Sequence, residues 1–425
     1  MTFITAAGRC SMSDKAHATY APVADRPRVL LHHQRFKMAR SAHAYVRGAT
    51  AKFYEWLEKS NGHKIPDGPP IWICGDCHLG NLGPVADAKG RVSIEIRDLD
   101  QTVVGNPAHD VIRLGLSLAT AARGSDLPGV TTAHIVEHLM DGYENGLAPA
   151  GEKEWVDAPE PVIAVMKKAL QRRWKHLAEE RIEDVEPEIP LGRRFWPLSS
   201  EERTEIAALG ASESVRRLVT HLKSRDASAT IDVLDAAYWV KGCSSLGRLR
   251  YAVLVRIRSP QKVGKTAGQD EICLLDIKEA VHAAAPRFVD APGFEMPADS
   301  AERVVMGARA LSPALGNRMI AASLLGKPVM VRELLPQDLK LEIDRLTRNQ
   351  ACKAARFLGN VVGHAHARQL SPADRRAWKQ TLRQNRSGEL DAPHWMWASI
   401  VDLVGAHERA YLHHCRQYAL AEQPG

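Results

Sequence analysis

IWICGDCHLGNLGPVADAKGRVSIEIRDLDQTVVGNPAHDVIRLGLSL, residues 71–118, is the stretch that decides the fold. It starts with a short apolar run at 71–74 and breaks at Gly75. Two strand-like runs follow at 81–86 and 91–97, and a turn-forming sequence at 87–90 joins them. A Gly-Asn-Pro turn then leads into an apolar helix. The stretch therefore predicts a polar loop, a hairpin and a helix in close succession.

The polar residues of this stretch have the spacing of a phosphoryl-transfer site. Asp76 and Asn81 are five residues apart, as are the Asp and Asn of a protein-kinase catalytic loop. Asp98 stands at the end of the predicted hairpin, where a second carboxylate would meet the Asn at a metal, and Asp100 follows it. One carboxylate orients the attacking hydroxyl in such sites, while an amide and a second carboxylate hold Mg²⁺ against the phosphates. The order Asp, His, Asn, hairpin, Asp indicates this chemistry.

Composition describes an ordinary globular protein. A length of 425 residues is enough for two or three packed layers or domains. The residues are 45% hydrophobic and 25% charged, as in soluble globular proteins. The net charge of +7 suits an anionic ligand, but it is spread along the chain, so we do not expect nucleic acid. No apolar run approaches the roughly 18 residues of a membrane span. Residues 1–27 lack the basic-then-apolar order of a secretory signal and are predicted to form a flexible tail.

The seven cysteines are scattered and odd in number, which indicates a reducing compartment and a cytoplasmic location. Cys74 and Cys77 form a C-x-x-C, the pattern of a redox pair or of half a zinc site. No second C-x-x-C or H-x-x-x-H stands out as a partner. We therefore expect Cys74 to belong to the buried strand and Cys77 to the loop.

The first half of the chain is otherwise predicted to be helical. Helical patterns occupy 28–60, 111–122, 131–146, 161–181 and 201–225. With the loop and hairpin, they predict a helical large lobe over residues 28–230. Residues 346–425 are also predicted to be helical and to pack on this lobe, through segments at 351–368, 373–385 and 395–421.

The pattern changes to strands at about residue 231. Runs at 236–240, 248–257 and 272–277 predict an antiparallel sheet, followed by a helix at 301–311 and a strand at 328–335. This gives a small β-rich nucleotide-binding lobe over residues 231–345. Arg332 in the last strand is expected to line a cleft between the lobes. The turn between the first two runs contains Gly242, Ser244, Ser245 and Gly247, whose backbone N–H groups are suited to phosphate oxygens.

Lys278 ends the third run, which is how kinases reach the α- and β-phosphates. The alternative is an edge-strand lysine whose ammonium reaches solvent. In a kinase a Glu on the next helix pairs with this lysine, and Glu302 is the acid available there, although Glu279 is nearer in sequence.

Several segments together resemble the uncharacterised bacterial family named domain of unknown function 2252, over nearly the whole chain. They are RGATAKF, GDCHLGNLG, RDLDQ, GNPAHDVIRLGLS, GCSSLGRLRY, LLDIKEA, ERVVMGARAL and GHAHAR. The GD-x-H-x-x-N, D-x-D and G-x-P-x-x-D segments also resemble the C-terminal lobe of aminoglycoside phosphotransferases and related kinase-like enzymes.

This resemblance implies a role for each matching residue. Asp76 is the catalytic base, Asn81 and Asp98 are Mg²⁺ ligands, and Asp100 is a second-metal or supporting acid. Asp110 braces the catalytic loop from the next helix, and His78 shapes the loop. The small-lobe elements follow the catalytic loop, the reverse of the kinase order. The resemblance therefore implies an α+β, two-lobed, circularly permuted kinase-like fold.

The leading functional interpretation is an ATP- and Mg²⁺-dependent phosphotransferase acting on a small-molecule or protein hydroxyl. Three alternatives stay open: a kinase-like AMP transferase, a non-catalytic nucleotide-binding or interaction module, and a metal-dependent hydrolase built on the Asp and His residues. The sequence identifies neither the substrate nor the oligomeric state.

Overall fold

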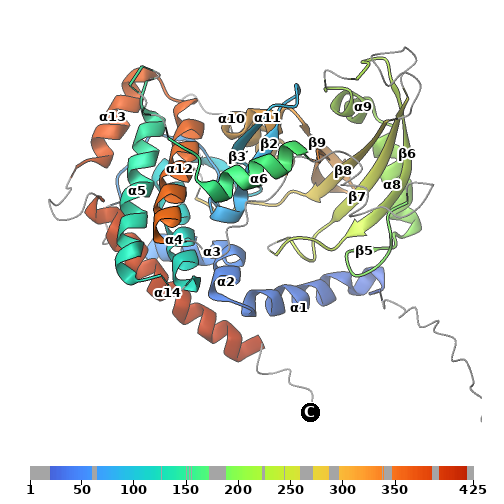
Figure 1. Ribbon diagram of the computed structural model, residues 1–425. Coiled ribbons are helices and arrows are strands. Elements are labelled where there is room, and N and C mark those ends of the chain that lie inside the picture. Colours follow the sequence, from blue (N-terminus) through green and yellow to red (C-terminus); the bar gives the residue numbers. More distant parts are fainter. Residues whose placement is uncertain are drawn as a thin grey trace, which may run out of the picture.

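The chain folds into a helical part and a six-stranded sheet that are joined by shorter elements, as the computed structural model shows (Figure 1). The fold class is mixed α+β, as predicted, and every strand pair is antiparallel. The structure describes residues 20–59, 65–125, 127–149, 151–152, 154, 156–171, 188–222, 225–243, 245–258, 271–286, 296–336, 338, 347–384 and 392–418.

The helical part combines segments from the two ends of the chain. Helix α12 packs along α5, while α13 and α14 pack on α5 and α4 (Figure 1, left). The α5–α12 contact is close, since a Cβ atom on Gly142 would lie 1.9 Å from the carbonyl oxygen of Arg356. The bounds are α3 (Thr50–Lys59), α4 (Pro107–Gly124), α5 (Gly129–Leu147), α12 (Arg348–Ala367), α13 (Pro372–Leu382) and α14 (His394–Tyr418).

The hairpin predicted from the sequence is confirmed. Strands β2 (Leu82–Ala86) and β3 (Val92–Ile96) pair antiparallel, with Leu82 opposite Ile96. Strand β1 (Ile71–Ile73) precedes the loop, and the short η2 helix (Leu79–Asn81) closes it. A strand that the sequence did not reveal, β4 (Val103–Gly105), pairs with β1.

The large sheet has the strand order β5-β6-β7-β8-β10-β9 (Figure 1, right). Three of its strands and β10 match predicted runs, whereas β5 and β9 are additional. The bounds are β5 (Phe195–Trp196), β6 (Thr230–Trp239), β7 (Arg250–Arg258), β8 (Glu271–Glu279), β9 (Met319–Leu324) and β10 (Lys327–Leu334). Helix α10 (Ser300–Leu311) and the short α11 (Pro313–Gly316) lie between β8 and β9 in sequence, and α10 packs into the helical core.

Three elements that precede the predicted boundary at residue 230 pack on the large sheet. β5, α8 (Ser200–Gly210) and α9 (Glu213–Val219) pack on the large sheet, where Trp196, Ile206 and Val219 share one core with its strands. Helix α6 (Glu160–Gln171) covers the start of the predicted 161–181 helix, whose remainder lies outside the described residues.

Helix α1 (Arg26–Ala39) runs from the sheet to the helical part (Figure 1, bottom). At its start the buried Arg26 forms a 2.7 Å ion pair with Glu202 of α8. At its end the Ala39 carbonyl accepts a hydrogen bond from the Tyr411 hydroxyl of α14. The predicted tail therefore ends earlier than residue 27, because η1 (Val23–Asp25) and α1 are ordered elements; residues 1–19 lie outside the described part. Helix α2 (Ala42–Gly48) follows α1.

None of the helices in the described ranges is long and apolar enough to span a membrane.

Candidate functional site

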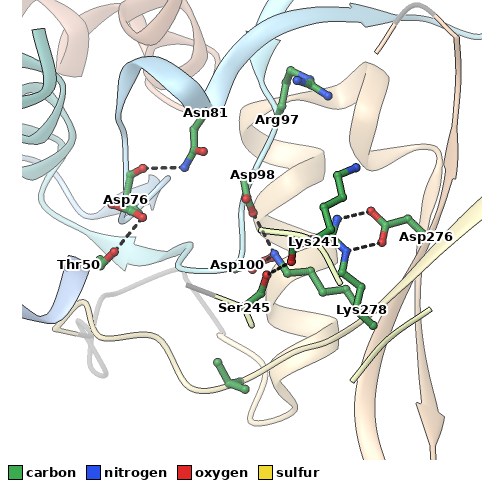
Figure 2. A network of polar contacts seen from close by, with 12 residues as sticks. Thr50, Asp76, Asn81, Arg97, Asp98, Asp100, Lys241, Ser245, Asp276 and Lys278 are labelled. Atoms are coloured by element: carbon green, nitrogen blue, oxygen red, sulfur yellow. Dashed lines mark hydrogen bonds and ion pairs between the residues drawn. The ribbon is translucent and has the colours of Figure 1, made fainter. Parts of the chain in front are cut away.

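Asp76 lies in the loop between β1 and η2, and donors from two other elements hold its carboxylate. Arg113 of α4 donates from Nε to Oδ1 at 2.9 Å. The Thr50 hydroxyl donates to Oδ2 at 2.8 Å (Figure 2). Burial raises the pKa of Asp76, and Arg113 and Thr50 oppose that rise without cancelling it. The predicted base is thus a fixed, nearly buried carboxylate.

Asn81 and His78 belong to the same loop. The Asn81 side-chain amide donates from Nδ2 to the Asp76 carbonyl oxygen at 2.9 Å, which orients its amide oxygen away from that bond (Figure 2). His78 is buried, with Nε2 3.9 Å from Asp76 Oδ2. Burial and the nearby Arg113 and Arg47 lower the pKa of His78 well below its ordinary value, so the imidazole is neutral at pH 7.

Asp110, near the start of α4, holds the loop by its backbone. Its Oδ2 accepts from the Cys74 N–H at 2.7 Å and its Oδ1 from the Gly75 N–H at 2.9 Å. His366 of α12 contacts Oδ2 through Nε2 at 3.1 Å. The hydrogen-bond network continues from His366 to Tyr143, whose hydroxyl lies 2.9 Å from His366 Nδ1. Buried hydrogen bonds thus tie the loop to the C-terminal helices.

This chain of hydrogen bonds assigns the histidine tautomer. The Trp378 Nε1–H donates to the Tyr143 oxygen at 3.0 Å, so the tyrosine hydroxyl has its own proton to donate to His366 Nδ1. His366 therefore carries its proton on Nε2 and donates it to Asp110.

The hairpin and the large sheet meet at three charged groups. The Lys278 ammonium lies 3.4 Å from Asp98 Oδ1 and also forms an ion pair with Asp100 Oδ2 (Figure 2). The Asp98 side chain is 48% exposed, whereas Lys278 is buried. Burial opposes ionisation of Asp98, but Lys278, Arg332 and Arg250 outweigh it and hold its pKa far below the ordinary value. Burial and the neighbouring Asp98 raise the pKa of Asp100, whose buried Oδ1 has no hydrogen-bond partner among the described residues.

A second charged cluster lies on the same face of the sheet. Arg250 of β7 donates to both oxygens of Asp276 at 2.9 and 2.7 Å, and Arg332 of β10 donates to Oδ2 at 3.0 Å. Strand register brings them together, because Ala252, two residues beyond Arg250, lies opposite Asp276 and Asp276 lies opposite Arg332. Burial raises the pKa of Asp276, but the two arginines outweigh it and hold that pKa well below its ordinary value. The trio keeps one positive charge in excess.

The rest of this face is apolar and covered by the chain itself. Leu254, Leu274 and Leu334 are four or two residues from Arg250, Asp276 and Arg332 on the same strands, and so lie on the same face of the sheet. They pack with Ile189 in a buried cluster. The open part of the sheet face is therefore its charged end.

The β6–β7 turn lies at this charged end. Gly242 and Gly247 both have positive φ, 98° and 89°, which explains why glycine occupies these positions. The Gly242 carbonyl accepts a 2.6 Å hydrogen bond from Lys37 of α1, and Ser245 is buried under the turn, bonded to the Lys241 carbonyl. Ser244 lies outside the described residues.

The loop, the hairpin end and the glycine turn enclose a cleft of about 300 Å³. Asp98 is the one carboxylate among the described residues that line it, while its cations number six. The cations are Lys37, Arg47, Arg97, Lys241, Arg250 and Arg332. Such a surplus of positive charge suits a polyanion.

A larger cavity of about 540 Å³ lies at the other end of the β2–β3 hairpin. It is lined by Asp87, Lys89 and Arg225, and the Arg225 guanidinium is already paired with Glu271 and Glu333. Among its described lining residues the carboxylates of Asp87, Glu271 and Glu333 outnumber the two cations, so this cavity is the weaker candidate for an anionic ligand.

The structure corrects one predicted site residue and adds others. Glu302, the acid expected to pair with Lys278, is exposed at the start of α10. Among the described residues, Lys278 forms ion pairs with Asp98 and Asp100 instead. The hairpin thus supplies the acid expected from the helix, because β8 ends beside the hairpin. Sequence reasoning missed the cleft residues Lys37, Arg47, Arg97, Lys241 and Arg250, because each lies in a separate segment with no local pattern that marks it.

The C-x-x-C does not form a thiol site. Cys74 and Cys77 are both buried, and hydrogen bonding to Cys77 together with burial raises the pKa of the Cys74 thiol well above its ordinary value. A thiol held protonated in this way is a poor nucleophile. Within the described ranges, no group of three or more His, Cys, Asp or Glu residues could hold a metal without another ligand.

Fold and site together define an α+β protein with a strongly cationic cleft between a polar loop and an antiparallel sheet. The chain belongs to a bacterial family described as an uncharacterised protein conserved in bacteria (DUF2252), whose sequence pattern matches residues 26–417. No curated protein and no solved structure matches the chain.

His407 of α14, next to Arg113, gives the fold a predictable response to acid. Burial and Arg113 lower its pKa from 6.5 to about 4. The unfolded chain therefore takes up the proton first, so the stabilising contribution is complete above pH 6.5 and is lost as the pH falls toward 4. One unit of pKa shift corresponds to about 1.4 kcal/mol. Between pH 7.5 and 5.0, the free energy of unfolding of wild type should therefore fall by roughly 2 kcal/mol more than that of His407→Gln. Urea unfolding at both pH values measures this, and equal losses would contradict it.

Proposed function

We propose that the chain is an ATP- and Mg²⁺-dependent phosphotransferase acting on a hydroxyl group. The observation that carries the proposal is the contact of Lys278 with Asp98 and Asp100 at the edge of the cationic cleft. A lysine from a sheet beside a metal-binding carboxylate is the arrangement with which kinases hold nucleotide phosphates.

The order of elements around this contact supports a kinase-like architecture. In the large sheet a glycine turn joins β6 and β7, Lys278 ends β8, and α10 follows before β9 and β10. Kinases arrange a glycine-rich loop, a lysine strand and a helix in this sequence. Here these elements come after the Asp76 loop, and helices α12 to α14 return to the first half. We therefore infer two lobes in circularly permuted order.

The donor set fits Mg²⁺ bound together with phosphates. Mg²⁺ is usually held by one or two carboxylates plus substrate phosphates and water, so a complete protein cage is not required. Asn81, Asp98 and Asp100 supply an amide oxygen and two carboxylates, and the buried Asp100 Oδ1 is an acceptor without a hydrogen-bond partner. Bound there, the metal would neutralise phosphate charge.

The chain's own groups have separate roles in this proposal. Asp76 orients the acceptor hydroxyl and accepts its proton. Lys278 leaves its carboxylate partners to bind phosphate oxygens, and the glycine turn supplies backbone N–H donors. Asp110 and His366 keep the loop in position, because they hold its backbone.

One observation favours a second candidate, a nucleotide-binding module without turnover. Both carboxylate oxygens of Asp76 already accept hydrogen bonds, from Arg113 and Thr50, and Asp76 is nearly buried. A carboxylate used in this way can be purely structural. In that case Asp76→Ala changes the affinity for Mg²⁺-ATP and the stability of the fold, and there is no catalytic turnover for it to abolish.

A thermal-shift titration with Mg²⁺-ATP tests the proposed site. At about 100 times Kd, a ligand stabilises the folded state by about 2.7 kcal/mol. We expect this gain for wild type and its loss in Asp98→Ala and Lys278→Ala. Matched controls are Asp87→Ala, at the other end of the hairpin and in the larger cavity, and Lys327→Ala, an exposed β10 lysine paired with Glu279. Equal gains in all five proteins, or none in wild type, would contradict the site.

A further inference from the structure

Arg47 is a cation in the cleft for which the described residues provide no acidic partner. It ends α2 and lines the cleft, and its guanidinium lies flat against the loop: a Cβ atom on Gly80 would be 2.9 Å from Cζ. Arginine presents a planar fork of N–H donors that matches carboxylate and phosphate groups. Such a group placed in a cleft without a counterion is ready to bind an anion.

Three other cleft cations differ from Arg47 in having partners that fix them. Arg250 and Arg332 share Asp276, and Arg97 donates to the Asp338 carbonyl. Lys37 is the nearest analogue of Arg47, because the described residues give it no acidic partner and its hydrogen bond goes to the Gly242 carbonyl, which carries no charge. Burial lowers the pKa of Lys37, and the positive charges of Arg47 and Arg40 act in the same direction. Lys37 and Arg47 therefore form an uncompensated pair.

This pair stands on the side of the cleft where an acceptor must approach. The segment around Arg47 is hydrogen-bonded to Asp76 and to its partner Arg113. The Val46 carbonyl accepts from Arg113 at 2.6 Å, and the Thr50 hydroxyl donates to Asp76 itself. Lys278, Asp98 and Asp100, the groups assigned to metal and nucleotide, come from the hairpin and β8 instead. A ligand group on Arg47 is therefore separate from the phosphates on Lys278.

We propose that the acceptor is itself a small anion, a hydroxyl compound carrying a phosphate or carboxylate group that Arg47 and Lys37 bind while its hydroxyl faces Asp76. This assignment rests on the proposed function, since it names the substrate class of the same site.

The lining of the cleft excludes other classes of acceptor. Its apolar side chains, among the described lining residues, are limited to Ala44 and Cys243, so an aromatic or aliphatic acceptor finds no complementary surface. A polyamine such as an aminoglycoside would meet six cations and one carboxylate. The chain thus differs in substrate class from the aminoglycoside phosphotransferases that its motifs resemble, because like charges repel in a desolvated site.

Isothermal titration of three probes against the protein saturated with Mg²⁺ and a non-hydrolysable ATP analogue tests this. The probes are glycerol 3-phosphate, glycerol and choline, which share hydroxyl chemistry and differ in charge. We expect glycerol 3-phosphate to bind to wild type and the other two to bind at least about tenfold more weakly. A charged hydrogen bond contributes about 1.5–3 kcal/mol, so Arg47→Gln should weaken glycerol 3-phosphate binding about 10- to 100-fold.

Two further variants separate charge from position. Arg40→Gln removes an equal charge nearby but outside the cleft lining and should change affinity less than threefold. Gly80→Ala keeps every charge but displaces the Arg47 guanidinium. It should weaken glycerol 3-phosphate binding nearly as much as Arg47→Gln does. Unfolding of each variant without ligand shows that it is folded.

The outcomes distinguish this inference from the proposed function. If the nucleotide analogue binds, but glycerol binds as well as glycerol 3-phosphate or Arg47→Gln has no effect, the anionic acceptor is wrong and the nucleotide site stands. If the nucleotide analogue does not bind wild type at all, the proposed function fails, and the acceptor assignment fails with it.

Discussion

Replacing Asp76 with asparagine is expected to reduce turnover of Mg²⁺-ATP by about 10²- to 10⁴-fold, the usual contribution of a general base. Asparagine keeps the size of the side chain and can still accept one bond, from Arg113 or Thr50, so the loop stays in place. It cannot accept a proton from the acceptor hydroxyl. The affinity for Mg²⁺-ATP should remain within about threefold, because Lys278, Asp98 and Asn81 are unchanged.

The measurement is ADP release with water as the acceptor, in a coupled assay on wild type and Asp76→Asn. Asp374→Asn is the control, since this exposed aspartate lies in the first turn of α13, which packs on α5 away from the cleft. Mass spectrometry of the products separates ADP from AMP and so tests AMP transfer as well. Full activity in Asp76→Asn would show that the carboxylate is structural.

Replacing Asp110 with alanine is expected to cause the largest loss of stability. The substitution leaves two backbone N–H groups, of Cys74 and Gly75, and the His366 Nε2–H without their acceptor in a buried region. Each orphaned donor costs about 1–3 kcal/mol, so for three donors we expect a loss of about 3–9 kcal/mol. The 75–81 loop should also lose its fixed position, and the nucleotide site with it.

Urea unfolding of wild type, Asp110→Ala and Asp141→Ala measures this. Asp141 is an exposed acid of α5 paired with Arg356, and its loss should cost less than about 1 kcal/mol. Asp110→Asn should fall between, because its amide oxygen can still accept one backbone bond. A cost for Asp110→Ala as small as that of Asp141→Ala would contradict the bracing role.

The local structure around Asp76 was predictable because it depends on neighbouring residues. The turn formers at 87–90 and the alternating apolar residues on either side specify the β2–β3 hairpin. The glycine turn and the strand before Lys278 have similar local signals. Strands β4, β5 and β9 were missed, because they are short and are defined by their partners more than by their own pattern.

The cationic lining of the cleft could not be predicted, because it depends on distant segments. Lys37 and Arg47 are ordinary basic residues of the N-terminal helices until α1 lies across the glycine turn. Arg250, Asp276 and Arg332 meet only through the register of three strands. For the same reason the acid beside Lys278 was sought on α10, whereas the hairpin supplies it.

The most direct test of the central claim is a crystal structure of the chain with MgCl₂ and a non-hydrolysable ATP analogue. The account predicts a metal bound by the Asn81 amide oxygen and the Asp98 carboxylate, with phosphate oxygens within hydrogen-bond reach of Lys278. A nucleotide bound elsewhere, for example in the larger cavity beside Asp87, with the Lys278–Asp98 contact intact, would contradict it.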